Sequence, residues 1–369
     1  MSTLDTVVHK AEIIVSCGSG GVGKTTSAAA IALHAALIGK RVVVITIDPA
    51  RRLADAFGLS DGLTNEPTQV KLESGVGGGE LWAMMLDPAT TFDDLVRRYA
   101  SSPERAERIL VNAFYRNIAG ALSGTQEYMA AEKLYQLHRD DRFDLVVVDT
   151  PPTRNALDFL DAPGTLTRFI NHRLFRLMML PARGGLRVLN VAAQPVLRAI
   201  GKVVGGEVLA DAIAFFQAFE GMESGFRDRA DAVSELLHSD VTSYVLIASA
   251  RRDTVEEAQY FAERLADSKL TVSAVVINRL QPRFGMPLPD DVADAARAAV
   301  AADADGHPEL GALWRNLSEL RALADAEEGV IAPLVADTDP QAIHRVPLLP
   351  NDVHDLVGLR EIAAHLFAQ

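Results

Sequence analysis

The stretch from Ile13 to Arg52, IIVSCGSGGVGKTTSAAAIALHAALIGKRVVVITIDPARR, decides the fold of this protein. It begins with the short apolar run Ile13–Cys17, continues with an alanine-rich helix pattern over Thr25–Ile38, and reaches a second, β-branched run at Val42–Ile47. Gly39 ends the helix pattern. A strand, a helix and a second strand in this order predict a β-α-β unit whose two strands run parallel.

The same alternation resumes further along the chain. Strand patterns occur in ELWAMML, FDLVVVDT, SYVLIASA, LTVSAVVINRL and HRVPLL, and a final helix is expected from about residue 352 to 367. We therefore predict an α/β fold with a doubly wound, mostly parallel sheet and helices on both faces. Two stretches show helix patterns only. They predict one domain in which a helical subdomain (89–141 and 165–238) is inserted into a core (1–88, 142–164 and 239–369).

Composition excludes several classes of protein. The net charge of −13 argues against non-specific binding of nucleic acid, which depends on Lys and Arg neutralising phosphates. A single cysteine, Cys17, excludes an internal disulfide framework and fits a reducing cytosol. The first residues lack the basic start and apolar run of a secretory signal, and no apolar stretch is long enough to span a membrane. We expect a cytoplasmic protein, with peripheral association at the membrane left open.

The segment Gly18–Thr25, GSGGVGKT, fits the pattern G-x-x-x-x-G-K-T, with a strand pattern before it and a helix pattern after it. In such a P-loop, backbone N–H groups and the helix N-terminus cradle phosphates, the lysine reaches the β- and γ-phosphates, and the hydroxyl of Thr25 ligates Mg²⁺. The alternative is a glycine-rich turn that binds nothing. We predict a P-loop NTPase that uses Mg²⁺, with a nucleotide-binding loop formed by Gly20, Gly21, Val22, Gly23, Lys24, Thr25 and Thr26; that the nucleotide is ATP follows from the resemblance described below.

Two aspartates follow strand patterns, at the position where parallel sheets collect their functional groups. Asp149 follows LVVV, as an acid that holds Mg²⁺ through water does, and Asp48 follows VVVITI and is placed to orient or deprotonate the attacking water. Each could instead only cap a loop, since aspartate is common in turns. We predict Asp48 and Lys24 as catalytic residues and Thr25 and Asp149 as the metal site.

Five segments together resemble the ArsA-type ATPases, the family of the arsenite-pump ATPase and of the ATPase that delivers tail-anchored membrane proteins. GSGGVGKTT is similar to the deviant Walker A loop of that family, TIDPARRLADAF to its switch I, and VVVDTPPTRNALDFL to its switch II. SGTQEYMAAEKL lies where the family has a P-G-x-x-E element, and VVINRL with HRVPLLPNDV resembles its adenine-contacting strand and loop. The resemblance extends over most of the chain.

The resemblance implies a dimer that encloses nucleotide between its subunits, in which ATP-driven closure reshapes a helical client site. It also implies that Asp48 activates the water, that Asn278 contacts adenine, and that Pro347 lies in the adenine-contacting loop. The client implied is a hydrophobic protein or a membrane-associated partner.

This chain departs from the family at one position of the loop. The family carries a signature lysine where Ser19 stands, and that lysine reaches the phosphates of the partner subunit. Loss of an organised cation at a developing anion costs about a hundredfold or more in rate. Either the chain is a slow homodimeric ATPase, or it forms a heterodimer with a paralogous ATPase that retains the lysine. Arg51 or Arg52 could replace part of the charge, or both could be solvated.

Two further features concern ligands and partners. One cysteine cannot build a soft-metal site, so we expect no arsenite site and no interfacial cysteine-bound zinc. Between Asp161 and Glu207 there is no acidic residue, while arginines are interleaved with apolar runs. This segment (165–206) could offer a basic-rimmed apolar surface to a client helix or to lipid, or its helices could pack on the same protein. Two function classes stay open, a nucleotide-switched ATPase and a catalytically silent subunit.

Overall fold

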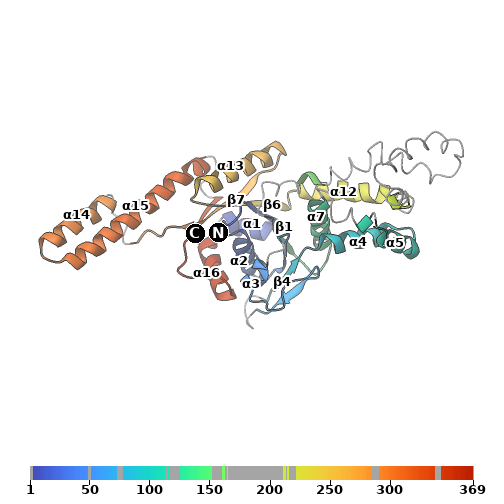
Figure 1. Cartoon of the computed structure of the whole chain (residues 1–369), viewed down its shortest axis with the longest axis horizontal. Coiled ribbons are helices and arrows are strands. Elements are labelled where there is room, and N and C mark those ends of the chain that lie inside the picture. The colour runs from blue at the N-terminus through green and yellow to red at the C-terminus, as the bar shows by residue number, and fades with distance from the viewer. Residues whose placement is uncertain are drawn as a thin grey trace.

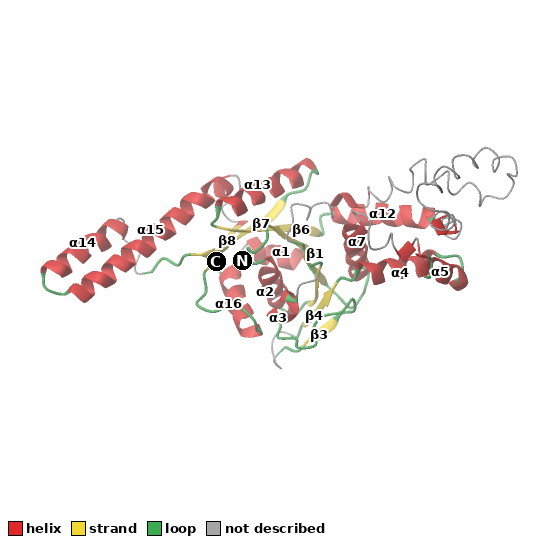
Figure 2. Ribbon diagram, in the orientation of Figure 1, coloured by secondary structure: helices red, strands yellow, loops and turns green. Residues whose placement is uncertain are grey.

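The structure is a computed structural model that describes residues 3–48, 51–72, 78–113, 115–116, 125–151, 160–162, 164, 211–212, 214–215, 222–284, 291–336 and 342–368. An eight-stranded sheet lies at its centre between helices (Figure 1 and Figure 2). Its order is β3-β4-β2-β5-β1-β6-β7-β8, and all neighbouring strands are parallel except the pair β3 and β4. The predicted α/β P-loop fold is thus confirmed. The strands are β1 (Ile13–Gly18), β2 (Arg41–Thr46), β3 (Thr68–Val70), β4 (Glu80–Met85), β5 (Leu145–Asp149), β6 (Thr242–Ser249), β7 (Val272–Leu280) and β8 (Ile343–Pro347).

One face of the sheet is covered by α1 (Thr3–Lys10), α2 (Lys24–Leu37), the short α3 (Arg52–Ala56) and α16 (Leu356–Phe367). Alternate strand residues point to this face, among them Ile14 of β1, Val44 of β2 and Val147 of β5. Helix α2 is buried on almost all sides, which explains its run of alanines, because small side chains let neighbouring elements approach closely. This packing fixes the start of α2, and with it Lys24, against the ends of the central strands.

The other face is covered by α7 (Thr125–His138), α12 (Glu223–Leu237), α13 (Arg252–Asp267) and part of α15 (Pro308–Ala336). The strand residues that alternate with the first set, such as Val15 and Val148, pack here against Leu134 of α7, Phe261 of α13 and Ile331 of α15. The run of four apolar residues in β5, one leucine followed by three valines, therefore reflects burial on both faces, as expected for a central parallel strand.

A separate helical group lies at one end of the sheet (Figure 2). It contains α4 (Pro88–Tyr99), α5 (Pro103–Leu110) and the outer parts of α7 and α12, and its own apolar cluster includes Leu95, Ile109 and Phe226. Because α7 contributes Tyr128 to this cluster and Leu134 to the core under the sheet, α7 connects the two. The boundaries of the helical subdomain stay a prediction, and the basic segment 165–206 lies outside the described residues.

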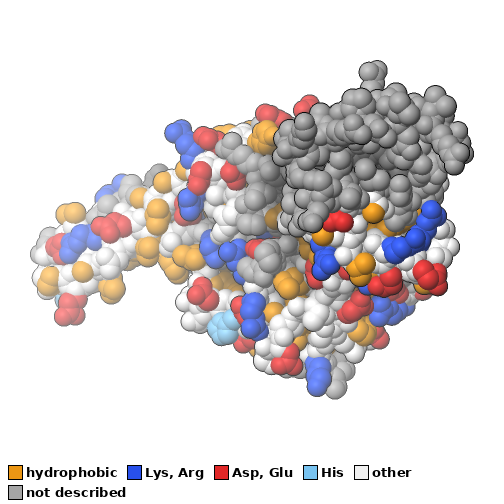
Figure 3. Space-filling view, turned by 45° about the vertical axis from the view of Figure 1, so that its right-hand side comes forward, with side chains coloured by type: hydrophobic (Ala, Val, Ile, Leu, Met, Phe, Trp, Pro, Cys, Tyr) orange, Lys and Arg blue, Asp and Glu red, His pale blue; other side chains and the backbone are white. Residues whose placement is uncertain are grey.

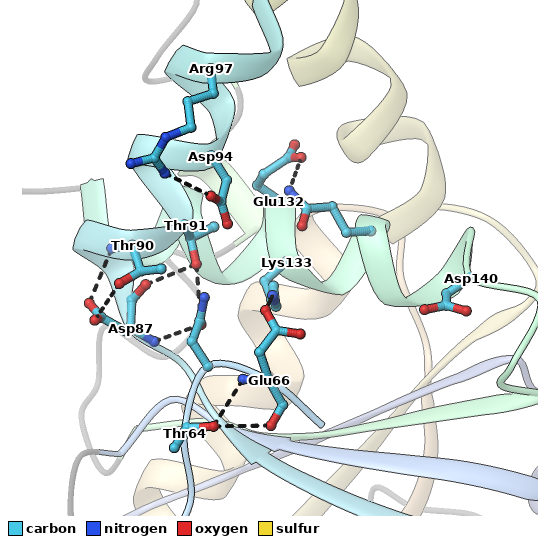
Figure 4. A network of polar contacts seen from close by, with 12 residues as sticks. Thr64, Glu66, Asp87, Thr90, Thr91, Asp94, Arg97, Glu132, Lys133 and Asp140 are labelled. Atoms are coloured by element: carbon cyan, nitrogen blue, oxygen red, sulfur yellow. Dashed lines mark hydrogen bonds and ion pairs between the residues drawn. The ribbon is translucent and has the colours of Figure 1, made fainter. Parts of the chain in front are cut away.

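Polar contacts attach α4 to the sheet (Figure 4). The carboxylate of Asp87 caps α4 by accepting from the backbone of Ala89 at 3.0 Å, while the side-chain oxygen of Asn65 accepts from the backbone of Asp87 at 2.9 Å. On α7, Lys133 lies 4.0 Å from the carboxylate of Glu66. These contacts link the helical group to the loop that precedes β3 and to the end of β4.

The sequence analysis did not anticipate a hairpin of α14 (Asp291–Ala304) and α15, which extends from the opposite end of the sheet (Figure 1). Only the last turns of α15 join the core, through residues such as Ile331 and Leu334. Within the described ranges, no helix is both long and apolar enough to cross a membrane.

Candidate functional site

The loop between β1 and α2 owes its path to glycines. Gly23, at the N-cap of α2, has φ 92°, a left-handed conformation that favours glycine, and a Cβ there would lie 2.2 Å from the side-chain nitrogen of Asn278. Gly18, at the end of β1, has φ 151°, and its Cβ would lie 2.1 Å from the carbonyl oxygen of Ile247. A side chain at Gly18 would collide with the backbone, and one at Gly23 would displace the amide of Asn278, which is the physical reason for glycine at both positions.

Lys24 is almost fully buried, although it carries a charge. Its Nζ donates a hydrogen bond of 2.7 Å to the carbonyl oxygen of Ser19, so the side chain lies back along the loop. Burial lowers the pKa of Lys24, and the negative charge of Asp149 partly offsets that effect. A lysine held in this way lines a cavity and can turn its ammonium group to an incoming phosphate.

Asp149 ends β5 and is 1% exposed. One carboxylate oxygen, Oδ2, accepts hydrogen bonds from the hydroxyls of Thr25 at 2.8 Å and of Thr46 at 3.0 Å. The other, Oδ1, is buried without a hydrogen-bond partner in the described part of the chain. Burial raises the pKa of Asp149 to about 6, although both threonine hydroxyls and Lys24 lower it.

These groups fit a magnesium ion. Mg²⁺ prefers oxygen ligands and keeps several waters, and here a threonine hydroxyl and a carboxylate with one unsatisfied buried oxygen lie in contact beside a cavity. In the regions that the structure describes, no group of three or more His, Cys, Asp or Glu side chains could hold a metal ion. A metal at Thr25 and Asp149 would take its remaining ligands from water or from oxygens of a bound ligand such as a phosphate.

Asp48 lies beside the same cavity, two residues after β2. Its backbone N–H donates to the hydroxyl of Thr46 at 3.2 Å, and its carboxylate lies 3.5 Å from Nη1 of Arg52. Thr46 thus contacts both Asp48 and Asp149. The register of the sheet explains this, because Thr46 and Asp149 are direct neighbours on the parallel strands β2 and β5.

The cavity has a volume of about 310 Å³. Its lining combines the cations Lys24, Arg52 and Arg279 with polar groups of the loop, which suits a polyphosphate. The lining residues are Gly21, Gly23, Lys24, Thr25, Thr26, Asp48, Arg52, Asp55, Ala56, Thr150, Arg279 and Val353.

A second cavity of about 190 Å³ shares Gly23, Thr26, Arg279 and Val353 with the first. Asn278 and Pro347, which the sequence analysis assigns to adenine, both line it together with Leu348 and Leu349. Two of the predicted loop residues, Gly20 and Val22, line neither cavity. The two cavities meet at Gly23: three cations line the first, and Pro347, Leu348 and Leu349 line part of the second.

Asn278 has a structural role that the sequence analysis did not predict. Its side-chain amide donates to the carbonyl oxygen of Val22 at 2.8 Å and accepts from the backbone of Arg279 at 3.0 Å. Arg279 in turn adopts a left-handed backbone, φ 62°, and donates from Nη1 to the carbonyl of Gly21 at 3.0 Å. The end of β7 therefore holds the phosphate loop from outside through two successive side chains.

Ser19 is 6% exposed, and its hydroxyl is buried without a hydrogen-bond partner among the described residues. The side chain is therefore packed into the protein rather than extended from it. Of the two arginines considered as substitutes for the missing lysine, Arg51 donates to the carbonyl of Ser60 at 2.7 Å, and only Arg52 lines the cavity.

The sequence analysis missed Thr46, Thr150 and Arg279. Thr150 lines the cavity and donates from its hydroxyl to the carbonyl of Ser16 at 2.7 Å. All three are adjacent to, or aligned with, residues that were predicted, so a search of strand ends for hydroxyl and cationic side chains would have found them. Of the switch segments, residues 49–50 and 152–159 lie outside the described ranges.

Comparison with known proteins identifies relatives of this chain. A family profile described as anion-transporting ATPase matches residues 11–287. The chain is 27% identical to the ATPase GET3 of Rhodotorula glutinis over 263 residues, which cover 71% of this chain and 68% of that protein. It is 28% identical to the ATPase get3 of Aspergillus terreus over 272 residues, 71% of each chain. With the ATPase get3 of Aspergillus niger it shares 28% identity over 284 residues, 75% of this chain and 76% of the relative.

Proposed function

We propose that this chain, which belongs to the anion-transporting, ArsA-type ATPase family and is an ATPase, is a nucleotide switch. It would couple hydrolysis of Mg²⁺-ATP to the handling of a hydrophobic client or a membrane-associated partner. The nucleotide would occupy the two adjoining cavities, with its phosphates beside Lys24 and its base beside Asn278 and Pro347.

One observation carries the assignment of the chemistry. Lys24, Thr25, Asp48 and Asp149 converge at the carboxyl ends of β1, β2 and β5. The hydroxyl of Thr46 connects Asp48 to Asp149, and the hydroxyl of Thr25 binds Asp149. In our proposal Lys24 binds the β- and γ-phosphates, Asp48 orients the attacking water and accepts its proton, and Thr25 binds Mg²⁺ directly while Asp149 does so through water. Bound Mg²⁺ would neutralise charge on the phosphate oxygens.

The test is Mg²⁺-dependent ATP hydrolysis by the purified chain over a range of protein concentrations, with Asp48→Asn beside it. We expect turnover per chain to rise with concentration and to disappear in the variant, while the variant still binds ATP. A variant that hydrolyses ATP at the wild-type rate contradicts the role of Asp48. Turnover independent of concentration contradicts a dimeric active unit.

The dimer is the second part of the proposal. A homodimer is the simpler assembly. The buried position of Ser19 supports the alternative, a heterodimer with a paralogous ATPase that supplies the lysine, since no side chain at this position reaches outward to a partner. A Ser19→Lys variant tests the premise that both assemblies share, the missing cation. Increased turnover of the isolated chain supports a missing cation as the cause of slow hydrolysis, and unchanged turnover contradicts it.

The client would bind at the helical group of α4, α5, α7 and α12. Helix α7 supports this, because it packs in both apolar clusters and touches β5, the strand that ends in Asp149. A shift of β5 on nucleotide binding would therefore reach the helical group directly.

We propose a cytoplasmic location with peripheral association at membranes. Flotation with anionic lipid vesicles, with and without ATP, tests the membrane part.

A further inference from the structure

Arg51 and Arg52 are consecutive residues at the start of α3, yet their side chains bind in different places. Nη2 of Arg51 donates to the carbonyl oxygen of Ser60 at 2.7 Å, within the turn that follows α3. Nη1 of Arg52 lies 3.5 Å from Oδ2 of Asp48, and Arg52 lines the phosphate cavity. Successive helical side chains diverge by about 100°, which accounts for the difference. Arg52 is therefore the member of the pair that can meet a ligand.

The contact between Arg52 and Asp48 is one that a stronger anion can displace. The Arg52 side chain is 60% exposed, whereas that of Asp48 is 15% exposed. Ion pairs with an exposed partner contribute little, because water screens the attraction. A terminal phosphate carries more charge than a carboxylate, and its oxygens match the paired donors of a guanidinium group.

We propose that Arg52 recognises the terminal phosphate of ATP, and that its pairing with Asp48 is the resting arrangement of the nucleotide-free protein. When ATP enters, Arg52 exchanges the carboxylate of Asp48 for oxygens of the γ-phosphate. The carboxylate of Asp48 then accepts a hydrogen bond from the attacking water. ADP has no γ-phosphate, so it leaves the pair in place. This inference rests on the proposed function, in which the cavity binds Mg²⁺-ATP and Asp48 orients the water.

The other two cations of the cavity are already engaged with the loop backbone. Lys24 donates to the carbonyl of Ser19, and Arg279 donates to the carbonyl of Gly21. Both contacts fix the phosphate loop itself, which meets ATP and ADP alike. Arg52 differs because its partner is the acid assigned to the attacking water.

The experiment measures the affinities of the full-length protein for ADP and for a non-hydrolysable ATP analogue, both with Mg²⁺. For Arg52→Ala we expect the preference for the ATP analogue over ADP to fall about tenfold, the effect of one charge-assisted contact. Arg52→Lys should retain part of the preference. Arg51→Ala is the matched control, and it should leave both affinities unchanged because Arg51 binds Ser60.

A double-mutant cycle tests the exchange of partners. Asp48→Asn removes the carboxylate charge that competes with the phosphate for Arg52. When Arg52 is present, this variant should bind the ATP analogue several-fold more tightly, because Arg52 no longer has to leave a charged partner. It should have no such effect in the Arg52→Ala background. If Arg52 only supported the start of α3, its replacement would change the affinities for ATP and ADP equally. The effects of Arg52→Ala and Asp48→Asn would then be additive.

The inference is overturned if Arg52→Ala keeps the wild-type preference for the ATP analogue over ADP. It is also overturned if Arg279→Ala is the variant that loses this preference while Arg52→Ala keeps it. The proposed function is judged separately, on the wild-type protein. If the wild type binds and hydrolyses Mg²⁺-ATP while Arg52→Ala keeps its preference, only the role of Arg52 is wrong. If the wild type binds neither nucleotide, the proposed function fails and the inference fails with it.

Discussion

The side-chain amide of Asn278 donates a hydrogen bond of 2.8 Å to the carbonyl oxygen of Val22, and so connects the end of β7 to the middle of the phosphate loop. Asn278 is 5% exposed, and its nitrogen occupies the space that a Cβ on Gly23 would need. The shape of the loop thus depends on a residue from the other half of the chain.

Replacement of Asn278 by alanine should weaken nucleotide binding and stability together. The variant leaves the carbonyl of Val22 without this buried donor, which costs about 1–3 kcal/mol. We expect a lower thermal midpoint and weaker binding of both ATP and ADP, measured by thermal unfolding and by titration. Asn316→Ala, on the exposed side of α15, is the control that should change neither. Wild-type nucleotide affinity in Asn278→Ala would contradict the role given to this amide.

Gly23→Ala and Gly21→Ala should differ in severity, although both glycines have positive φ, 92° and 79°. At Gly21 no atom lies within 4 Å of the added Cβ, so the cost is the backbone strain alone, about 1–2 kcal/mol. At Gly23 the Cβ also collides with Asn278. We therefore expect Gly23→Ala to lose nucleotide binding and Gly21→Ala to retain part of it. Equal losses in a titration with ATP would show that strain, not the collision, dominates.

Thr46→Val should reduce turnover far more than the loss of one buried hydroxyl lowers stability, about 1–3 kcal/mol. Valine keeps the shape of threonine but removes the hydroxyl that contacts Asp48 and Asp149. We expect kcat to fall about tenfold or more, since misplaced reacting groups lose rate steeply, together with a higher Mg²⁺ requirement. Thr91→Val is the control. Thr91 lies in the network at the start of α4 (Figure 4), so its loss should lower stability and leave kcat unchanged.

Breaking the ion pair between Glu132 and Arg229 should destabilise the helical group. Glu132 is fully buried, and Arg229 donates to its two oxygens at 2.7 Å from Nε and from Nη2. Removing one partner of a buried pair leaves an uncompensated charge and costs about 3–5 kcal/mol. Urea unfolding of Arg229→Met measures this loss. The exposed pair of Arg97 and Asp94 offers a comparison, because Arg97→Ala should cost about 1 kcal/mol or less.

His34 should lower stability in mild acid, against the opposite effect of Asp149, whose raised pKa makes the folded protein take up a proton in the same range. Burial lowers the pKa of this histidine, although Asp5 opposes the effect. Below the unfolded pKa of about 6.5, the unfolded chain therefore binds a proton more readily than the folded protein, and the free energy of unfolding declines as pH falls. His34 stacks on Phe367 with ring centroids 3.6 Å apart. Denaturant unfolding should therefore give His34→Phe a higher free energy of unfolding at pH 5.5, relative to its value at pH 7, than the wild type has. An unchanged pH dependence would exclude His34.

Local patterns were sufficient to predict much of the fold and the motif of the site. The alanine-rich helix after GSGGVGKT and the strand β5 with its four apolar residues could be predicted from local sequence, since helix and strand patterns depend on neighbours within a few positions. The family resemblance added Asn278 and Pro347. It did not anticipate the hairpin of α14 and α15, because no motif in that stretch marks where two helices leave the core.

The sequence by itself determined which chemical groups the protein carries and where each stands on a strand or helix: the lysine and threonine after the glycine loop, and aspartates after β2 and β5. Only the tertiary structure decided which of them touch. Thr46 meets Asp149 because β2 and β5 are paired in register, Asn278 reaches Val22 because β7 ends beside the loop, and Arg52 faces Asp48 while Arg51 faces Ser60. These contacts join residues whose partners are set by strand order and packing, and neither is encoded in any short segment of the chain.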